Sequence, residues 1–187
     1  MNTREETINL LLDEIGNGIV IGVTGKISRE LFELRLKRGE QPDDFYMMGS
    51  MGHALAIGLG VAMNTKKKVY VLNGDGGCLM KLGTLATHAK ILPNNLVHIV
   101  LDNGCHDSTG GQETAFRLIA KHLPNVRILK VKKGSRNDLG RPNISPKKIA
   151  NNFRKKYFLK ILKIKDVFLK KRQPCQVRLR LFNFEGI

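Results

Sequence analysis

The sequence predicts an α/β fold, a three-layer, doubly wound domain built on a mostly parallel sheet. Short apolar runs alternate with helix-like segments through the first 143 residues, and these runs are continuously apolar, as in strands buried on both faces. The length of 187 residues suits one sizeable core rather than two ordinary domains. We therefore expect one domain core over residues 1–146, with a tail over 147–187 that completes it or is partly disordered.

The expected elements follow in order along the chain. Residues 1–16 carry acids inside a short helical pattern. The apolar runs predict strands at 18–25, 45–50, 68–74 and 95–103. Helical periodicity predicts helices at 28–37, 52–63 and 78–92, with Ser28 as the N-cap of the first. The tail predicts a helix at 147–157, a strand at 158–164, a short helix at 166–171 and a strand at 176–182.

A glycine or polar cluster follows each of the first four predicted strands. These clusters are "TGK", "GSMGH", "GDGG" and "DNGCHDSTGG". Because the carboxyl ends of parallel strands meet at one edge of a sheet, the four loops are expected to converge there. That edge is where doubly wound sheets bind their ligands.

The composition constrains the partners. Lys and Arg number 32 against 16 Asp and Glu, and the formal charge of +16 favours an anionic partner. The basic residues gather after Lys147 without a nucleic-acid-binding signature, so we interpret them as solvated faces and expect no nucleic-acid binding. No apolar run reaches the roughly 18 residues that cross a bilayer. Three cysteines without C-x-x-C spacing fit a reducing compartment, and we expect a cytoplasmic protein with no membrane contact.

Asp75, inside "LNGDGGC", admits three readings: a helix cap, a turn residue or a metal ligand. Glycines at 74, 76 and 77 allow close approach of a ligand, and a following helix offers free N–H groups to an anion such as a diphosphate. A carboxylate beside a diphosphate needs a cation between them, and Mg²⁺ or Ca²⁺ accepts such oxygens. Asn103 follows 28 residues later, about the length of one helix and one strand, and favours the metal reading.

"GDGG", an apolar helix and then "LDNG" together resemble the bipartite signature of thiamine-diphosphate enzymes. The resemblance implies that Asp75, Asn103 and the main-chain carbonyl of Cys105 hold the Mg²⁺ or Ca²⁺ that anchors the cofactor. The first residue of the usual asparagine pair is Asp102 here, a departure that leaves the ligand at Asn103 unchanged.

"GSMGHALAIGLGVAM" resembles the turn of the same enzymes that contacts the cofactor's aminopyrimidine. By that resemblance, the Gly49 carbonyl accepts from the 4′-amino group and Met51 wedges the cofactor into its bent shape. An ordinary core methionine is the equal alternative for Met51. The residues implied to contact the cofactor are Thr24, Gly25, Gly49, Ser50, Met51, Gly74, Gly76, Gly77, Cys78 and Asn103.

Five blocks between Thr24 and Pro146 resemble the diphosphate-binding, C-terminal type domain of a 2-oxo acid decarboxylase family, the phosphonopyruvate decarboxylases. The sulfopyruvate decarboxylase beta subunits come next. The resemblance implies decarboxylation of phosphonopyruvate to phosphonoacetaldehyde and CO₂, with sulfopyruvate or another 2-oxo acid as the alternative substrate. A non-catalytic, basic polyanion-binding protein on the same fold is the alternative of another class.

The catalytic glutamate of these enzymes lies on a pyrimidine-binding domain, for which 187 residues leave no room. We therefore expect a pyrimidine-binding partner subunit or domain in a hetero-oligomer or homodimer. The alternative is that the chain is a fragment of a longer enzyme. The segment between "GGQET" and "GSRNDLGRP" is also too short for the helix, strand and helix that the family has there.

Two histidines are catalytic candidates under this resemblance. His106 is expected near the thiazolium as an acid or as a donor to the substrate carboxylate, and His53 is the second candidate, with structural hydrogen bonding as the alternative for each. His88 and His98 fall inside a helix and a strand, and we interpret them as structural.

Several other polar residues have two possible roles. Ser108, Thr109 and Gln112 are candidate contacts to cofactor or substrate, or loop caps. Arg136 and Arg141 have the fork geometry that binds a phosphonate dianion, but pairing with acids at a subunit interface is the favoured reading.

Overall fold

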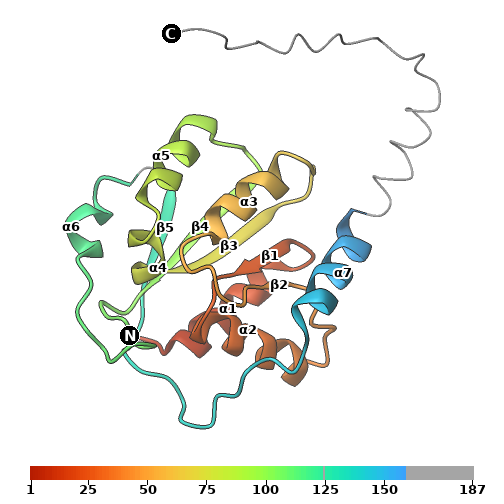
Figure 1. Cartoon of the computed structure of the whole chain (residues 1–187), viewed down its shortest axis with the longest axis horizontal. Helices are drawn as coiled ribbons and strands as arrows, with labels where there is room; N and C mark the ends of the chain where they lie inside the picture. The colour runs from red at the N-terminus through yellow and green to blue at the C-terminus, as the bar shows by residue number, and fades with distance from the viewer. Residues whose placement is uncertain (124, 159–187) are drawn as a thin grey trace, which may run out of the picture.

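The computed structural model describes residues 1–123 and 125–158. They form a five-stranded, all-parallel sheet with strand order β2-β1-β3-β4-β5 (Figure 1). The strands are β1 (Ile19–Gly22), β2 (Phe45–Tyr46), β3 (Val69–Gly74), β4 (Leu96–Asp102) and β5 (Val126–Lys130). The helices are α1 (Arg4–Ile15), α2 (Lys26–Lys37), α3 (Ala54–Ala62), α4 (Asp75–Leu79), α5 (Leu82–Ile91), α6 (Phe116–Ala120) and α7 (Pro146–Tyr157).

Helices cover both faces of the sheet, which confirms the predicted α/β fold. The chain runs from β1 to β2 on one side and then crosses back to β3 on the other. Because parallel crossovers are right-handed, connections that run in opposite directions lie on opposite faces. α1 and α2 pack together on one face, and α3 and α5 pack together on the other (Figure 1). The direction of winding therefore changes between β1 and β3.

The core is built from the apolar runs of the inner strands. All four residues of β1 are buried, and Val71, Leu72, Ile99 and Leu101 of the neighbouring strands are buried with them. Such runs bury side chains on both faces of the sheet, which is why they are continuously apolar.

Three local predictions need correction. Ser28 does not cap a helix, because α2 begins two residues earlier with Gly25 as N-cap, and the Ser28 hydroxyl donates to the Gly22 carbonyl at 2.9 Å. The single helix predicted at 78–92 is two helices, α4 and α5, separated at Met80 and Lys81. The glycine turn at Gly52 packs against these two residues. β2 spans only two residues at the edge of the sheet.

The segment predicted to be too short, residues 115–133, contains the short helix α6 and the edge strand β5. β5 pairs directly with β4, so the sheet has five strands in the described part of the chain.

The helix predicted at 147–157 is observed as α7. Ser145 caps it by accepting from the Lys148 N–H at 3.2 Å, and Pro146 occupies its first turn. Ile149, Phe153 and Tyr157 pack into the main core, with the rings of Phe153 and Phe45 5.3 Å apart. The remaining tail predictions, from residue 159 onward, lie outside the described residues. Within the described residues, the helices are too short or too polar to cross a membrane.

Candidate functional site

The candidate site is a cavity of about 460 Å³ at the carboxyl edge of the sheet. Loops that follow β1, β3 and β4 bound it, at the point between β1 and β3 where doubly wound sheets bind ligands. The residues singled out from the sequence that line it are Thr24, Met51, Gly74, Asp75, Gly76, Gly77, Asn103, Cys105, His106, Ser108, Thr109 and Gln112.

Five other predicted residues do not line this cavity. Gly25 and Gly49 line a second cavity of about 290 Å³, which shares Thr24 with the first. The Cys78 side chain is buried in the core beside Val100 and Phe116, so only its main chain remains for a cofactor contact. Ser50 and His53 are exposed in the turn before α3, and His53 Nδ1 lies 3.1 Å from the Ser50 carbonyl oxygen.

Two glycines of "GDGG", Gly76 and Gly77, have neighbours that leave no room for a side chain. A Cβ at Gly76 would stand 2.5 Å from Nδ1 of His106, and a Cβ at Gly77 would stand 2.5 Å from Oδ1 of Asn73. Asn73 Oδ1 in turn accepts from the Gly74 N–H at 3.0 Å. Side chains of other residues therefore occupy the space beside Gly76 and Gly77, while all three glycines line the cavity.

Asp75 is a buried carboxylate at the first position of α4. The N-cap of α4 is Gly74, so Asp75 does not cap the helix. Its side chain is 3% exposed, and its Oδ2 accepts from the Thr114 hydroxyl at 2.6 Å. Burial raises the pKa of the Asp75 carboxyl, against the lowering effect of the Thr114 bond. Within the described residues no Lys or Arg forms an ion pair with it.

Asn103 and Cys105 shape the loop after β4. The Asn103 Oδ1 accepts from the Cys105 N–H at 3.1 Å, and the Asn103 Nδ2 donates to Oδ2 of Asp107 at 2.6 Å. The Cys105 thiol also donates to Asp107, at 3.1 Å between Sγ and Oδ1. Burial, together with Asp107, raises the pKa of that thiol to about 11. Both residues line the cavity that contains Asp75.

Asp102, the departure from the usual asparagine pair, has partners of its own. Its Oδ1 accepts from the Gly104 N–H at 2.9 Å, and its Oδ2 accepts from Nε of Arg117 at 3.0 Å. The extra charge at this position is therefore balanced by an arginine that follows 15 residues later.

The turn before α3 packs against the "GDGG" helix. Residues Gly49, Ser50 and Gly52 all have positive φ angles, of 80°, 54° and 89°. The Gly49 N–H donates to the Thr24 hydroxyl at 2.9 Å, and a Cβ at Gly52 would stand 3.2 Å from the Gly77 carbonyl oxygen. The turn is thus joined to the loops after β1 and β3, and Met51 faces the cavity between them.

Sequence reasoning missed several cavity residues, among them Arg4 and Asp107. Arg4, from α1, is 5% exposed and donates to both oxygens of Glu30 and to Asp107. Asp107 lies inside "CHDSTGG", where its position in the loop was the only signal. Although burial opposes it, the Cys105, Arg4 and Gly134 bonds hold the pKa of Asp107 below its ordinary value.

Comparison with known proteins decides the family. A family model described as "Thiamine pyrophosphate enzyme, C-terminal TPP binding domain" matches residues 23–167. The chain belongs to the thiamine pyrophosphate enzyme family. The match includes the cavity residues that follow β1, β3 and β4.

Relatives within the thiamine pyrophosphate enzyme family are decarboxylases by name. A phosphonopyruvate decarboxylase of Streptomyces viridochromogenes is 39% identical over 184 residues, which covers 81% of this chain and 45% of that protein. A sulfopyruvate decarboxylase subunit beta of Methanothermobacter thermautotrophicus is 44% identical over 114 residues, covering 61% of this chain and 60% of that one. The chain spans about half the length of the phosphonopyruvate decarboxylases that it matches.

The donor set at this thiamine pyrophosphate enzyme site suits a hard cation. Within residues 1–123 and 125–158, no group of three or more His, Cys, Asp and Glu side chains is arranged to hold a metal ion. The predicted donors are instead the Asp75 carboxylate, the Asn103 amide and the Cys105 main-chain carbonyl. Oxygen donors of these types bind Mg²⁺ and Ca²⁺. The residues present therefore fit the metal and the diphosphate.

Proposed function

We propose that this chain supplies the metal and diphosphate half of the site of a decarboxylase that converts phosphonopyruvate to phosphonoacetaldehyde and CO₂. The supporting observation is Asp75, a buried carboxylate without a basic partner in the described residues, inside a glycine-lined cavity. A buried carboxylate needs a compensating charge. A divalent cation beside a diphosphate provides it.

In this proposal, Mg²⁺ or Ca²⁺ binds Asp75, Asn103 and the carbonyl of Cys105. The diphosphate lies against Gly74, Gly76 and Gly77, which line the cavity. When bound, thiamine diphosphate supplies the electron sink for the bond that breaks as CO₂ leaves. Val23, Ile27, Met51, Met80 and Leu101 give the cavity an apolar wall.

His106 is the residue of this chain that we propose to hold or move a proton. Its ring is half-buried, lines the cavity and lies against Gly76 of the diphosphate turn. His53 stays a prediction of lower rank, because its exposed ring does not line the same cavity.

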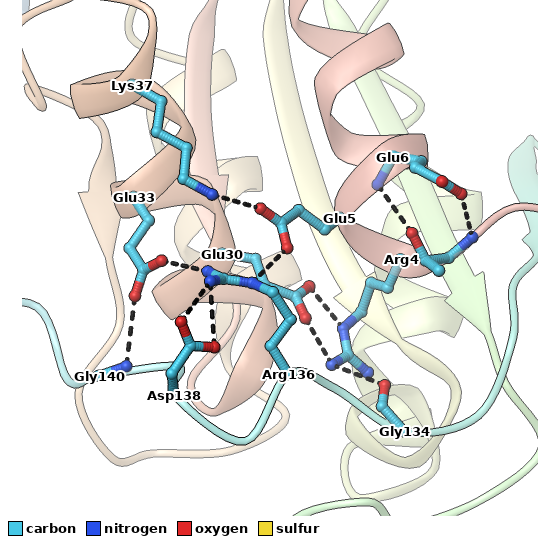
Figure 2. A network of polar contacts seen from close by, with 11 residues as sticks. Arg4, Glu5, Glu6, Glu30, Glu33, Lys37, Gly134, Arg136, Asp138 and Gly140 are labelled. Atoms are coloured by element: carbon cyan, nitrogen blue, oxygen red, sulfur yellow. Dashed lines mark hydrogen bonds and ion pairs between the residues drawn. The ribbon is translucent and has the colours of Figure 1, made fainter.

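Arg141 is the arginine that we propose for the acidic head of the substrate. Arg136 donates to Glu5, Glu33 and Asp138 of its own chain, so its guanidinium is already occupied (Figure 2). Arg141 forms no ion pair with any described residue and lines the cavity that includes Thr24 and Gly49. A guanidinium binds phosphonate or sulfonate oxygens in pairs.

The rest of the site is proposed to come from a pyrimidine-binding partner, as a second subunit in a hetero-oligomer or as another part of a longer chain. The relatives named as a beta subunit support the first form, and the phosphonopyruvate decarboxylases, of which the match spans 45%, support the second. In the described part of the chain, the thiols of Cys78 and Cys105 form no disulfide, which supports a reducing, cytoplasmic setting.

The test is reconstitution. The chain is assayed with thiamine diphosphate and Mg²⁺, alone and with a pyrimidine-binding partner encoded beside it, on phosphonopyruvate and on sulfopyruvate. We expect CO₂ release only with the partner, and faster release from phosphonopyruvate. Release by the chain alone would contradict the half-site, and faster release from sulfopyruvate would reassign the substrate.

A polyanion-binding role is the second candidate, because the formal charge is +16. Binding of this kind weakens steeply with salt and does not depend on Asp75. Measurement of nucleic-acid affinity between low and physiological salt, with and without Asp75→Ala, separates it from cofactor binding.

A further inference from the structure

Asp107 receives four hydrogen-bond donors in the loop after β4. Its Oδ2 accepts from the Arg4 guanidinium at 2.9 Å and from Nδ2 of Asn103 at 2.6 Å. Its Oδ1 accepts from the Cys105 thiol at 3.1 Å, and the Gly134 N–H is shared between Oδ2 at 3.2 Å and Oδ1 at 3.3 Å. An ionised carboxylate has about four lone-pair sites, so these donors use its full capacity. Asp107 is therefore not available as a further metal ligand.

A buried ion pair between Arg4 and Glu30 holds the guanidinium that donates to Asp107. Arg4 donates from Nε and Nη2 to the two oxygens of Glu30, at 2.7 and 2.8 Å (Figure 2). The side chains of Arg4 and Glu30 are 5% and 4% exposed. Burial of these charges costs desolvation free energy that their attraction only partly offsets. A gain in stability is therefore a weak explanation for this ion pair. Its direct consequence is that Nη1 of Arg4 is held in a fixed orientation toward Asp107.

The contact with Asp107 determines how Asn103 presents its amide. A carboxylate only accepts, so the amide nitrogen must face Asp107 and the amide oxygen must face the other way. That oxygen accepts one bond from the Cys105 N–H and keeps a second lone pair for a cation. The reversed amide would offer nitrogen, which cannot bind a cation.

We propose that Asp107, anchored by the Arg4–Glu30 pair, is a positioning residue that holds Asn103 and the Cys105 loop in the orientation that binds the metal. The inference rests on the proposed function, since it concerns the same metal site. It also joins α1 and α2, which contribute Arg4 and Glu30, to the loop after β4. Residues that orient metal ligands typically change metal affinity by 10- to 100-fold when removed.

The experiment is a Mg²⁺ titration of the full chain, with its pyrimidine-binding partner present, at a fixed concentration of thiamine diphosphate, read as the Mg²⁺ concentration that half-saturates cofactor binding. The variants are Asp107→Asn, which keeps the shape and removes the charge, and Asp75→Ala, which removes a proposed ligand. The matched control is Asp138→Asn, because Asp138 also pairs with an arginine but its side chain is 74% exposed. Melting temperature without metal or cofactor is recorded for each.

We expect Asp107→Asn to raise the half-saturating Mg²⁺ concentration by about 10- to 100-fold, with binding recovered at high Mg²⁺ and Asp138→Asn unchanged. If Asp107→Asn lowers only the melting temperature and leaves the Mg²⁺ requirement within twofold of wild type, the residue is structural and the inference is wrong. If the wild-type chain shows no Mg²⁺-dependent binding, or if Asp75→Ala binds normally, the proposed function fails instead.

A second variant covers a failure of Asp107→Asn to fold. The double variant Arg4→Gln/Glu30→Gln replaces the buried ion pair with two neutral amides and leaves no unpaired charge between them. The same increase in the Mg²⁺ requirement is expected, because Asp107 loses its anchor. An unchanged requirement in this folded variant contradicts the role of the pair.

Discussion

The ring of His106 lies against Gly76, with Nδ1 only 2.5 Å from the point where a Cβ of residue 76 would stand. Gly76 belongs to α4, which directly follows β3, and His106 belongs to the loop after β4; β3 and β4 are adjacent strands of the sheet. A side chain at residue 76 would collide with the ring of His106, 30 residues later in the chain. The second glycine of "GDGG" therefore makes room for this histidine as well as for a ligand.

Gly76→Ala is expected to displace the His106 ring from the cavity wall. An added methyl group leaves no space for the ring in its present position, and overpacking of this kind costs about 1–3 kcal/mol. Cofactor affinity should fall by about 5- to 150-fold, the equivalent of that range. The measurement is thiamine diphosphate titration with Mg²⁺. The control is Gly83→Ala in α5, where a Cβ meets nothing within 4 Å. Equal affinity for both variants would contradict the packing.

Gly58 and Gly60 of α3 provide a matched pair for stability. A Cβ at Gly58 would overlap a methyl group of Val71 in β3, whereas a Cβ at Gly60 meets nothing within 4 Å. Gly58→Ala should lower the free energy of unfolding by about 1–3 kcal/mol through overpacking. Gly60→Ala should raise it by roughly 0.5–1 kcal/mol, since alanine is the better helix former. Urea unfolding of both variants measures the difference, and the same sign for both would refute the register of α3 on β3.

His98 is expected to make the fold sensitive to acid. Its ring is 1% exposed, and burial together with His88 lowers the pKa of His98 to about 3. The unfolded chain, with an ordinary histidine pKa near 6.5, binds the proton more readily between pH 6.5 and 3. The free energy of unfolding should therefore fall as the pH drops below 6.5, by about 1.4 kcal/mol per pH unit for this one group.

The matched test compares His98→Gln with His122→Gln, because the His122 side chain is exposed. Urea unfolding between pH 7 and 5 should show a flatter pH dependence for His98→Gln and the wild-type slope for His122→Gln. A wild-type slope in His98→Gln would mean that another group causes the acid sensitivity.

Substitution of Arg141 should affect substrate binding more than turnover. Arg141→Ala in the reconstituted enzyme is expected to raise KM for phosphonopyruvate by about 10- to 150-fold, the loss of one charge-assisted contact worth about 1.5–3 kcal/mol. Arg136→Ala should leave KM nearly unchanged, because its partners are Glu5, Glu33 and Asp138 (Figure 2). A larger KM effect from Arg136→Ala would overturn the choice of Arg141.

The fold and the centre of the site could be predicted from the sequence because their signals are local. Continuous apolar runs such as Ile19–Gly22 indicated buried parallel strands, and the cluster around Asp75 marked a strand end. The separation between Asp75 and Asn103 matched the length of one helix and one strand, so both residues were expected at one edge of the sheet. The structure places them in one cavity. The resemblance to thiamine-diphosphate enzymes rested on the same short blocks, and the family match confirmed it.

The misses have physical causes that a single sequence does not reveal. Ser28 has the type of an N-cap residue, but the conformation of Gly25 starts α2 earlier and the hydroxyl is used by Gly22. The break between α4 and α5 lies against Gly52, which approaches from a distant turn and leaves no local signal in residues 78–92. The Arg4 contacts join residues 26 and 103 positions apart, so no spacing pattern could indicate them.

The most direct test of the metal and diphosphate half-site is calorimetric titration of thiamine diphosphate into the full chain, with its pyrimidine-binding partner present, in Mg²⁺ and in EDTA. We predict binding in Mg²⁺ that is lost in EDTA and in Asp75→Ala, and retained in Asp138→Asn. Equal binding with and without Mg²⁺, or full binding by Asp75→Ala, would contradict the account.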